Sequence, residues 1–165
     1  MRTLFDAIAS GLDRADARAR IWAARSALVA CHTIVLSPRG ALEIDAEDEL
    51  RALVRATMDR LTGHVQRAST LPAAPDWVGA IHRDTGHPHG HVVLAGGVPD
   101  PRGGATRPVV LYRREYAVMR AEAARAARVE SDRGASRALV LRYYVDGRPT
   151  RDRERERGRE RGIDR

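Results

Sequence analysis

The amino-acid sequence predicts an α+β domain whose main elements follow the order β-α-β-β-α-β. Two observations carry this prediction. Short runs rich in apolar and β-branched residues alternate along the chain with two long segments whose apolar residues recur at helical spacing. The chain has 165 residues, 43% of them hydrophobic and 31% charged, which fits one globular domain with its own core.

The first expected element is an N-terminal helix over residues 4–30, with Gly11 as a point where the pattern can divide into two helices. Its apolar stripe consists of Leu4, Phe5, Ile8, Leu12, Ile21, Trp22 and Leu28. A strand over Cys31–Ser37 follows, closed by a Pro-Arg-Gly turn. Acidic residues from Glu47 then open an amphipathic helix whose buried face comprises Leu50, Leu53, Val54, Met58, Leu61 and Val65.

The second half of the chain begins, after a loop over residues 66–76, with two strand-like runs, Trp77–Asp84 and His89–Ala95, which form a hairpin. Residues 96–107 hold four glycines and two prolines, as expected of a flexible loop long enough to move over a site. A brief strand-like run at 109–111, a helix over Arg113–Val129 and a strand over Ala138–Val145 complete the domain.

With the N-terminal helix and the 109–111 run set aside, this order is that of a ferredoxin-like fold: an antiparallel sheet with both helices on one face. The other face is then open for a ligand, except where the N-terminal helix covers it. We expect this domain to span residues 1–146 and residues 147–165 to form a disordered, Arg-rich tail, because that stretch has almost no apolar residues to bury.

The charge of the chain is compatible with a nucleic-acid partner but does not establish one. The net charge is +7, and all 29 basic residues are arginine. An alanine- and arginine-rich composition without lysine is also what a GC-rich genome produces. No apolar run is long enough to cross a membrane, and no secretory signal opens the chain, so we expect a cytoplasmic protein without a membrane partner.

Three histidines on the predicted hairpin are the main chemical feature of the sequence. If residues 85–88 form the hairpin loop, Asp84 pairs with His89 and His82 pairs with His91. Alternation then places His82, Asp84, His89 and His91 on the open face of the sheet and the apolar residues of both strands on the helix face. Three imidazoles on one face are typical of a metal site, with Asp84 as a fourth ligand or as a carboxylate that orients a ligand histidine.

The run Trp77–Val93, with its His-Arg-Asp-Thr stretch followed by Pro-His-Gly-His, resembles the metal-binding motif of plasmid mobilisation relaxases of the HUH endonuclease superfamily. The resemblance extends over about residues 32–128. Gly90 differs from the family, which usually has a larger apolar residue between the paired histidines. The resemblance implies that His82, His89 and His91 bind Mg²⁺ or Mn²⁺, which polarises a scissile phosphate. It also implies attack by a tyrosine hydroxyl on single-stranded DNA at an origin of transfer or replication, through a phosphotyrosine intermediate.

The position of the nucleophile departs from the relaxase pattern. Relaxases have their tyrosine near the N-terminus, whereas the first tyrosine here is Tyr112. The replication-initiator branch of the superfamily has it on a helix after the paired histidines, an order that Tyr112 and Tyr116 match. Their i, i+4 spacing puts both hydroxyls on one helix face, with Tyr116 inside the helix preferred. The alternative is that Tyr116 packs in the core. Tyr143 and Tyr144 are expected to be structural or to stack on bases.

Arg83, Arg113, Arg114 and Arg120 are the expected DNA-contacting arginines, although those on the helix equally fit a solvated face. Two functions compete with site-specific DNA nicking. One is a non-catalytic DNA-binding accessory protein of plasmid mobilisation that lacks the nucleophile and works with other mobilisation proteins. The other is a metal-dependent phosphodiesterase that uses water to cleave a small substrate and does not need the tyrosines.

Overall fold

The computed structural model describes residues 3–38, 47–83, 88–131, 139–145 and 148–149, and the side chains it describes end at residue 125. The main sheet is built from β3 (Cys31–Pro38), β4 (Trp77–His82), β5 (His89–Ala95) and β8 (Leu139–Val145). These strands lie in the order β4-β5-β3-β8, and every neighbouring pair is antiparallel. The sheet continues through β1 and β2 beyond β4 and through β9 beyond β8.

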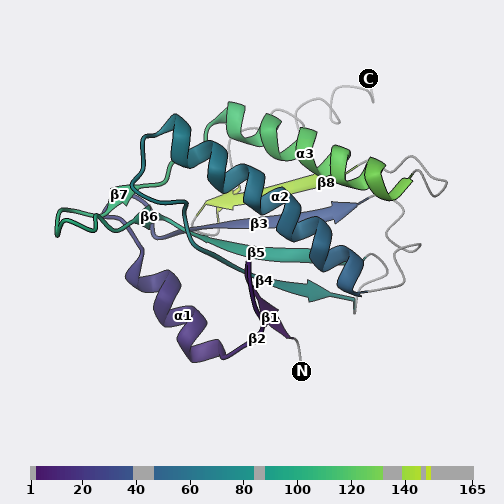
Figure 1. The fold of residues 1–165 in the computed structure, drawn as a ribbon, viewed down its shortest axis with the longest axis horizontal. Coiled ribbons are helices and arrows are strands. Elements are labelled where there is room, and N and C mark those ends of the chain that lie inside the picture. The colour runs from purple at the N-terminus through teal and green to yellow at the C-terminus, as the bar shows by residue number, and fades with distance from the viewer. Residues whose placement is uncertain (1–2, 39–46, 84–87, 132–138, 146–147, 150–165) are drawn as a thin grey trace, which may run out of the picture.

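Helix α2 (Glu47–Ala68) connects β3 to β4, and helix α3 (Arg113–Ser131) connects β5 to β8. Both helices lie side by side against the same face of the sheet (Figure 1). This arrangement confirms the ferredoxin-like α+β prediction. The six apolar residues predicted for the buried side of α2 are all buried, and they form one core with Ile34, Leu36, Ile81, Val92 and Leu94 of the sheet.

Helix α1 (Arg14–Ala23) lies on the opposite face of the sheet. Ala17 and Ile21 of this helix pack in a second apolar cluster that includes Val78 of β4 and Ala95 of β5. Val78 is next to the first residue of β4 and Ala95 is the last residue of β5, so α1 covers one end of this face. The other end of the same face, where β4 ends and β5 begins, carries the histidines.

The predicted helix over residues 4–30 is wrong in its first part, where the chain forms the short strands β1 (Leu4–Phe5) and β2 (Ser10–Leu12). The cause is local hydrogen bonding. The Asp6 carboxylate accepts hydrogen bonds from the N–H groups of Ile8 and Ala9, at 2.9 and 2.8 Å, and so holds a turn. Gly11 has a φ of +80°, outside the helical range. The helix begins only after Asp13, whose side chain caps it.

Residues 96–107 are also more ordered than predicted, because β6 (Gly97–Val98) pairs with β7 (Arg107–Pro108). This segment follows the last residue of β5 and therefore lies at the end of that strand opposite His89. It therefore does not lie over the histidines, whereas the sequence predicted a loop able to move over a site. Residues 109–111 are not a strand of either sheet. Instead, His32 Nε2 hydrogen-bonds to the Val109 carbonyl at 2.8 Å and fixes this segment against the core.

The predicted tail over residues 147–165 falls mostly outside the described residues. Within it, β9 (Arg148–Pro149) pairs with β8.

The buried carboxylate of Glu115 fixes the beginning of α3. It is 2% exposed. One oxygen accepts the Tyr112 N–H at 2.8 Å, and the other accepts Arg114 Nε at 2.6 Å. The first of these bonds is the return half of a capping box, since Tyr112 precedes the helix and Glu115 is its third residue. Burial raises the pKa of Glu115, but the hydrogen bonds outweigh this effect and leave the pKa below its ordinary value.

We expect Glu115→Gln to lower the free energy of unfolding by about 1.5–3 kcal/mol at pH 7, the usual range for hydrogen bonds to a charged group. Because the folded pKa is depressed, this stabilisation is present above the unfolded pKa and is lost as pH falls through the folded pKa. The difference between wild type and variant should therefore shrink towards pH 3. Urea denaturation at the two pH values measures it.

Glu122→Gln is the matched control, because Glu122 pairs with Arg60 only at 3.9 Å on the surface of the helix layer. We expect it to change stability by less than about 0.5 kcal/mol at either pH. If Glu115→Gln lowered the free energy of unfolding equally at both pH values, the charge of Glu115 would not contribute to stability.

Candidate metal centre

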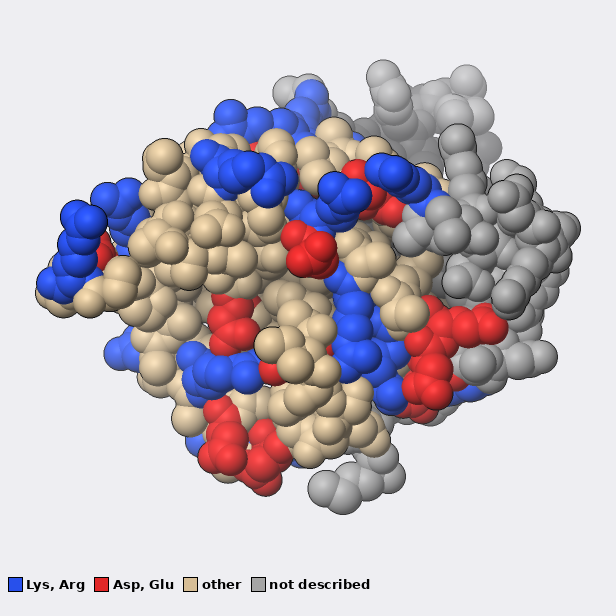
Figure 2. Space-filling model, viewed as in Figure 1, with Lys and Arg blue, Asp and Glu red and all other residues tan. Residues whose placement is uncertain are grey.

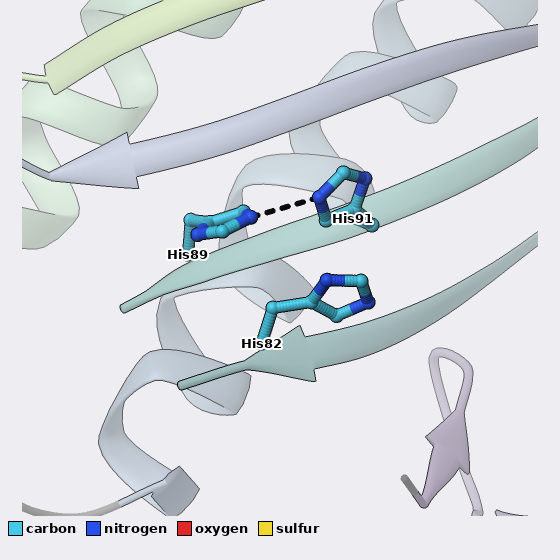
Figure 3. Close-up of side chains that lie close together, drawn as sticks. All are labelled: His82, His89 and His91. Carbon is cyan, nitrogen blue, oxygen red and sulfur yellow. Dashed lines mark hydrogen bonds between the residues drawn. The ribbon is translucent and has the colours of Figure 1, made fainter. Parts of the chain in front are cut away.

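The side chains of His82, His89 and His91 lie together on the open face of the sheet (Figure 3). His82 is the last residue of β4, and the other two alternate along the start of β5. The ring centroids of His82 and His91 are 4.1 Å apart, and those of His89 and His91 are 4.7 Å apart. Each imidazole is half-buried, so solvent and a ligand can reach the cluster.

The predicted pairing of His82 with His91 is wrong by two residues. In the structure His82 pairs with His89, and His91 pairs with Ala80. A shift of two residues leaves every side chain on the same face, so the prediction that the three histidines share the open face is unaffected. Both registers bury the same apolar residues on the helix face. For this reason the alternation of the sequence could not distinguish them.

Gly90 stands between the paired histidines because α2 lies directly over it. A Cβ atom built on Gly90 would be 2.6 Å from Cγ2 of Val54, which is fully buried in α2. Ile81, the partner of Gly90 across the hairpin, also packs in this core. The glycine therefore lets α2 approach the hairpin at this point. This contact gives a physical reason for a glycine, instead of a larger residue, between the two histidines.

The three imidazoles form a group that could hold a metal ion. One nitrogen from each ring lies within 4.8 Å of the other two. Nε2 of His89 and Nε2 of His91 are 2.8 Å apart and share a hydrogen bond. Ligand nitrogens around an ion at ~2.1 Å are roughly 3.0–3.4 Å apart, so small side-chain rotations bring the three onto one ion. Three protein ligands leave further coordination positions open for water or a substrate, as in catalytic sites.

Asp84, the expected fourth ligand or orienting carboxylate, lies outside the described residues. Arg83 follows β4 directly and is exposed at the same end of the sheet. Arg83 is therefore the next residue after the metal-site candidate His82.

The tyrosines proposed as nucleophiles lie in a different layer. Tyr116 is in α3 and packs against the core between the helices and the sheet. Tyr112 directly precedes α3 and is 59% exposed, with the Arg114 guanidinium 5.7 Å from its ring centroid. Helix α3 lies beside α2 on one face of the sheet (Figure 1), and the imidazoles project from the other face (Figure 3). The sheet itself thus stands between Tyr116 and the histidine cluster.

Arg113, Arg114 and Arg120 are exposed on α3, in the helix layer and away from the imidazoles. Figure 2 shows this side of the molecule, where acidic side chains lie among the basic ones over the helices. Arg114 also binds the Glu115 carboxylate. This pattern is typical of a solvated helix face, the alternative that the sequence had left open.

Trp22 is an exposed aromatic residue that sequence reasoning had assigned to an apolar stripe. It is 59% exposed, whereas its neighbour Ile21 is 8% exposed. Consecutive residues on a helix point about 100° apart, so Ile21 and Trp22 cannot both face the sheet. The adjacent positions of Ile21 and Trp22 in the sequence were therefore enough to predict that only one of them faces the sheet.

Comparisons of the chain with family models, with curated proteins and with solved structures returned no match. Among the described helices, none is both long and apolar enough to cross a membrane.

We expect Gly90→Ala to lower the free energy of unfolding by about 1–3 kcal/mol, because the added methyl group overpacks the contact with Val54. Val54→Ala removes the obstructing Cγ2 atom and should recover part of this loss. The two substitutions are then non-additive in a double-mutant cycle followed by urea denaturation. Additive effects would mean that α2 does not press on Gly90.

We expect isothermal titration with Mn²⁺ to show one bound ion per chain. His89→Ala or His91→Ala should weaken binding by more than about 100-fold, since each removes one of three ligands. His64→Gln is the matched control, because His64 is on α2 beside Glu115, in the helix layer. Equal affinity in His64→Gln and His91→Ala would exclude the cluster as the binding site.

Proposed function

We propose that the chain is a metal-dependent enzyme that cleaves single-stranded DNA at the His82, His89 and His91 cluster. The observation that carries the proposal is the position of the cluster. Three imidazoles lie within ligand distance on a sheet face that α1 and the helix layer leave open. The resemblance of residues 77–93 to the relaxase motif supports DNA as the substrate and plasmid mobilisation or rolling-circle replication as the setting.

The ligand set consists only of nitrogen atoms in the described residues. We propose Mn²⁺ or Mg²⁺, as in the proteins that the motif resembles. When bound, such an ion supplies Lewis-acid polarisation of the scissile phosphate. The half-buried imidazoles would hold the ion at the edge of the open face, and exposed Arg83 would contact the phosphate backbone there.

The placement of α3 favours a hydrolytic form of this reaction, in which water is the nucleophile. A tyrosine nucleophile must come within hydrogen-bonding reach of the reacting phosphate. Tyr116 packs on the far side of the sheet from the imidazoles, and Tyr112 begins the same helix. A phosphotyrosine intermediate on either residue would require α3 to leave its packed position. Water is therefore the nucleophile that we propose for this reaction.

Incubation of the protein with Mn²⁺ and labelled single-stranded DNA tests the proposal on a denaturing gel. We expect cleavage that EDTA abolishes and that His91→Ala reduces by at least about 100-fold, the scale of losing a group that stabilises the transition state. In the hydrolytic form, no covalent adduct accumulates. Tyr112→Phe and Tyr116→Phe then cleave at the wild-type rate.

Each alternative gives a different pattern on the same gel. A covalent adduct that disappears in Tyr116→Phe or Tyr112→Phe would restore the phosphotyrosine mechanism. Binding of DNA without cleavage at any metal concentration would contradict the enzyme and favour the accessory DNA-binding role. His64→Gln serves as the control for the histidine variant.

A further inference from the structure

The ion pairs of Arg20 show how α1 is oriented on the open face. Its guanidinium binds Asp76 at 2.7 Å and Asp6 at 2.9 Å. Asp76 directly precedes β4, which begins at Trp77 and ends at His82. The Arg20 side of α1 therefore faces the end of the sheet that is remote from the imidazoles. The opposite side of the helix faces along the strands towards them.

This opposite side carries Arg14, Arg18 and Trp22, which recur at intervals of four residues and so lie within about 80° of one another around the helix. All three are exposed, Trp22 to 59%. Arg25 follows the helix, and its guanidinium is 4.6 Å from the Trp22 ring centroid. Among the described residues, no carboxylate forms an ion pair with Arg14 or Arg18. The surface is thus basic and has an aromatic ring at its centre.

The sheet face between α1 and the cluster is a short, partly exposed floor. Thr33, Val35 and Val93 on this face are half-buried, and Val35 pairs directly with His91. From Val78, under α1, to His82 the strand advances four residues, or about 13 Å. A flexible polymer that contacts Trp22 can therefore reach the imidazoles within a few monomer units.

We propose that Trp22 is a base-stacking platform for single-stranded nucleic acid, with Arg14, Arg18 and Arg25 as its phosphate contacts. An exposed indole stacks on any base, and flanking guanidinium groups bind the backbone without sequence preference. Because the ring lies on the side of α1 that faces the histidines, a stacked strand is directed across the floor to the metal site. The platform rests on the proposed function for its substrate class, single-stranded DNA.

The test measures binding without metal, so that it does not depend on cleavage. Fluorescence anisotropy of a labelled thymidine oligomer of about 12 nucleotides, a typical site size, is followed in EDTA. We expect Trp22→Ala to weaken binding by about 5- to 150-fold, the range for loss of one stacked base. Trp22→Phe, which keeps a ring, should bind within about threefold of wild type. Arg18→Gln should lower the salt dependence by about 0.7 log units per log unit of salt.

Leu28→Ala and Arg67→Gln are matched controls. Leu28 is 76% exposed beyond α1, and Arg67 is exposed on α2 in the helix layer. Both should bind the oligomer like wild type. Intrinsic fluorescence gives a second readout, since the only other tryptophan, Trp77, is buried. Quenching by the oligomer should be present in wild type and absent in Trp22→Phe.

The outcomes separate the platform from the proposed reaction. Wild-type affinity in Trp22→Ala, or no binding by the wild type in EDTA, would overturn the platform even if Mn²⁺-dependent cleavage occurs. Loss of binding in Trp22→Ala without any cleavage by the wild type would support the platform and contradict the enzyme. A change of oligomeric state in Trp22→Ala, measured by light scattering, would show that the ring contacts another protein chain and would also overturn the platform.

Discussion

The close contact between α2 and the β4–β5 hairpin is the constraint on which the site depends. The helix approaches the strands where Gly90 leaves space for Val54, and a Cβ atom there would be only 2.6 Å from the valine. Since side chains alternate between the two faces of a strand, burying Gly90 and Val92 against α2 directs His89 and His91 to the other face. The position of the imidazoles is thus a consequence of how the core is packed, and no local interaction among them is needed to bring them together.

The N-terminal segment completes both faces of the sheet. Phe5 is fully buried beside Gly79, where a Cβ atom would lie 2.9 Å from the ring, and it meets Trp77 edge-on at 5.9 Å between centroids. Arg55 of α2 holds the turn after Phe5 through the carbonyls of Asp6 and Ala9. The chain then passes the β4 edge and returns on the opposite face as α1. One short segment therefore closes the core and also borders the open surface that leads to the histidines.

The parts of this structure that sequence reasoning predicted are those governed by periodic burial. The acidic first turn predicted the start of α2 to within one residue of Glu47, and alternation predicted the bounds of β5 and its open face correctly. Prediction from periodicity failed where single hydrogen bonds determine the backbone conformation. At Asp6, the carboxylate holds a turn inside an apparently helical pattern. Prediction from periodicity also failed for the hairpin register, because shifts by two residues preserve the buried face. The predicted fold already put the helix of Tyr116 on the face opposite the histidines, whereas the i, i+4 spacing that suggested Tyr112 and Tyr116 as nucleophiles carries no information on their layer.

All three imidazoles come from one hairpin, within ten residues of the chain. An ion held by them would close only a short loop, and closing a short loop removes little conformational entropy from the unfolded chain. The unfolded chain would also keep part of its affinity, because His89 and His91 remain neighbours without the sheet. Binding to the unfolded state reduces the stabilisation that a ligand gives to the native state. An ion at this site would therefore contribute little to the stability of the domain. Structural zinc sites differ in this respect when their ligands connect segments that are distant in the chain. The fold is maintained by its core, and an ion bound at this site would remain available for exchange.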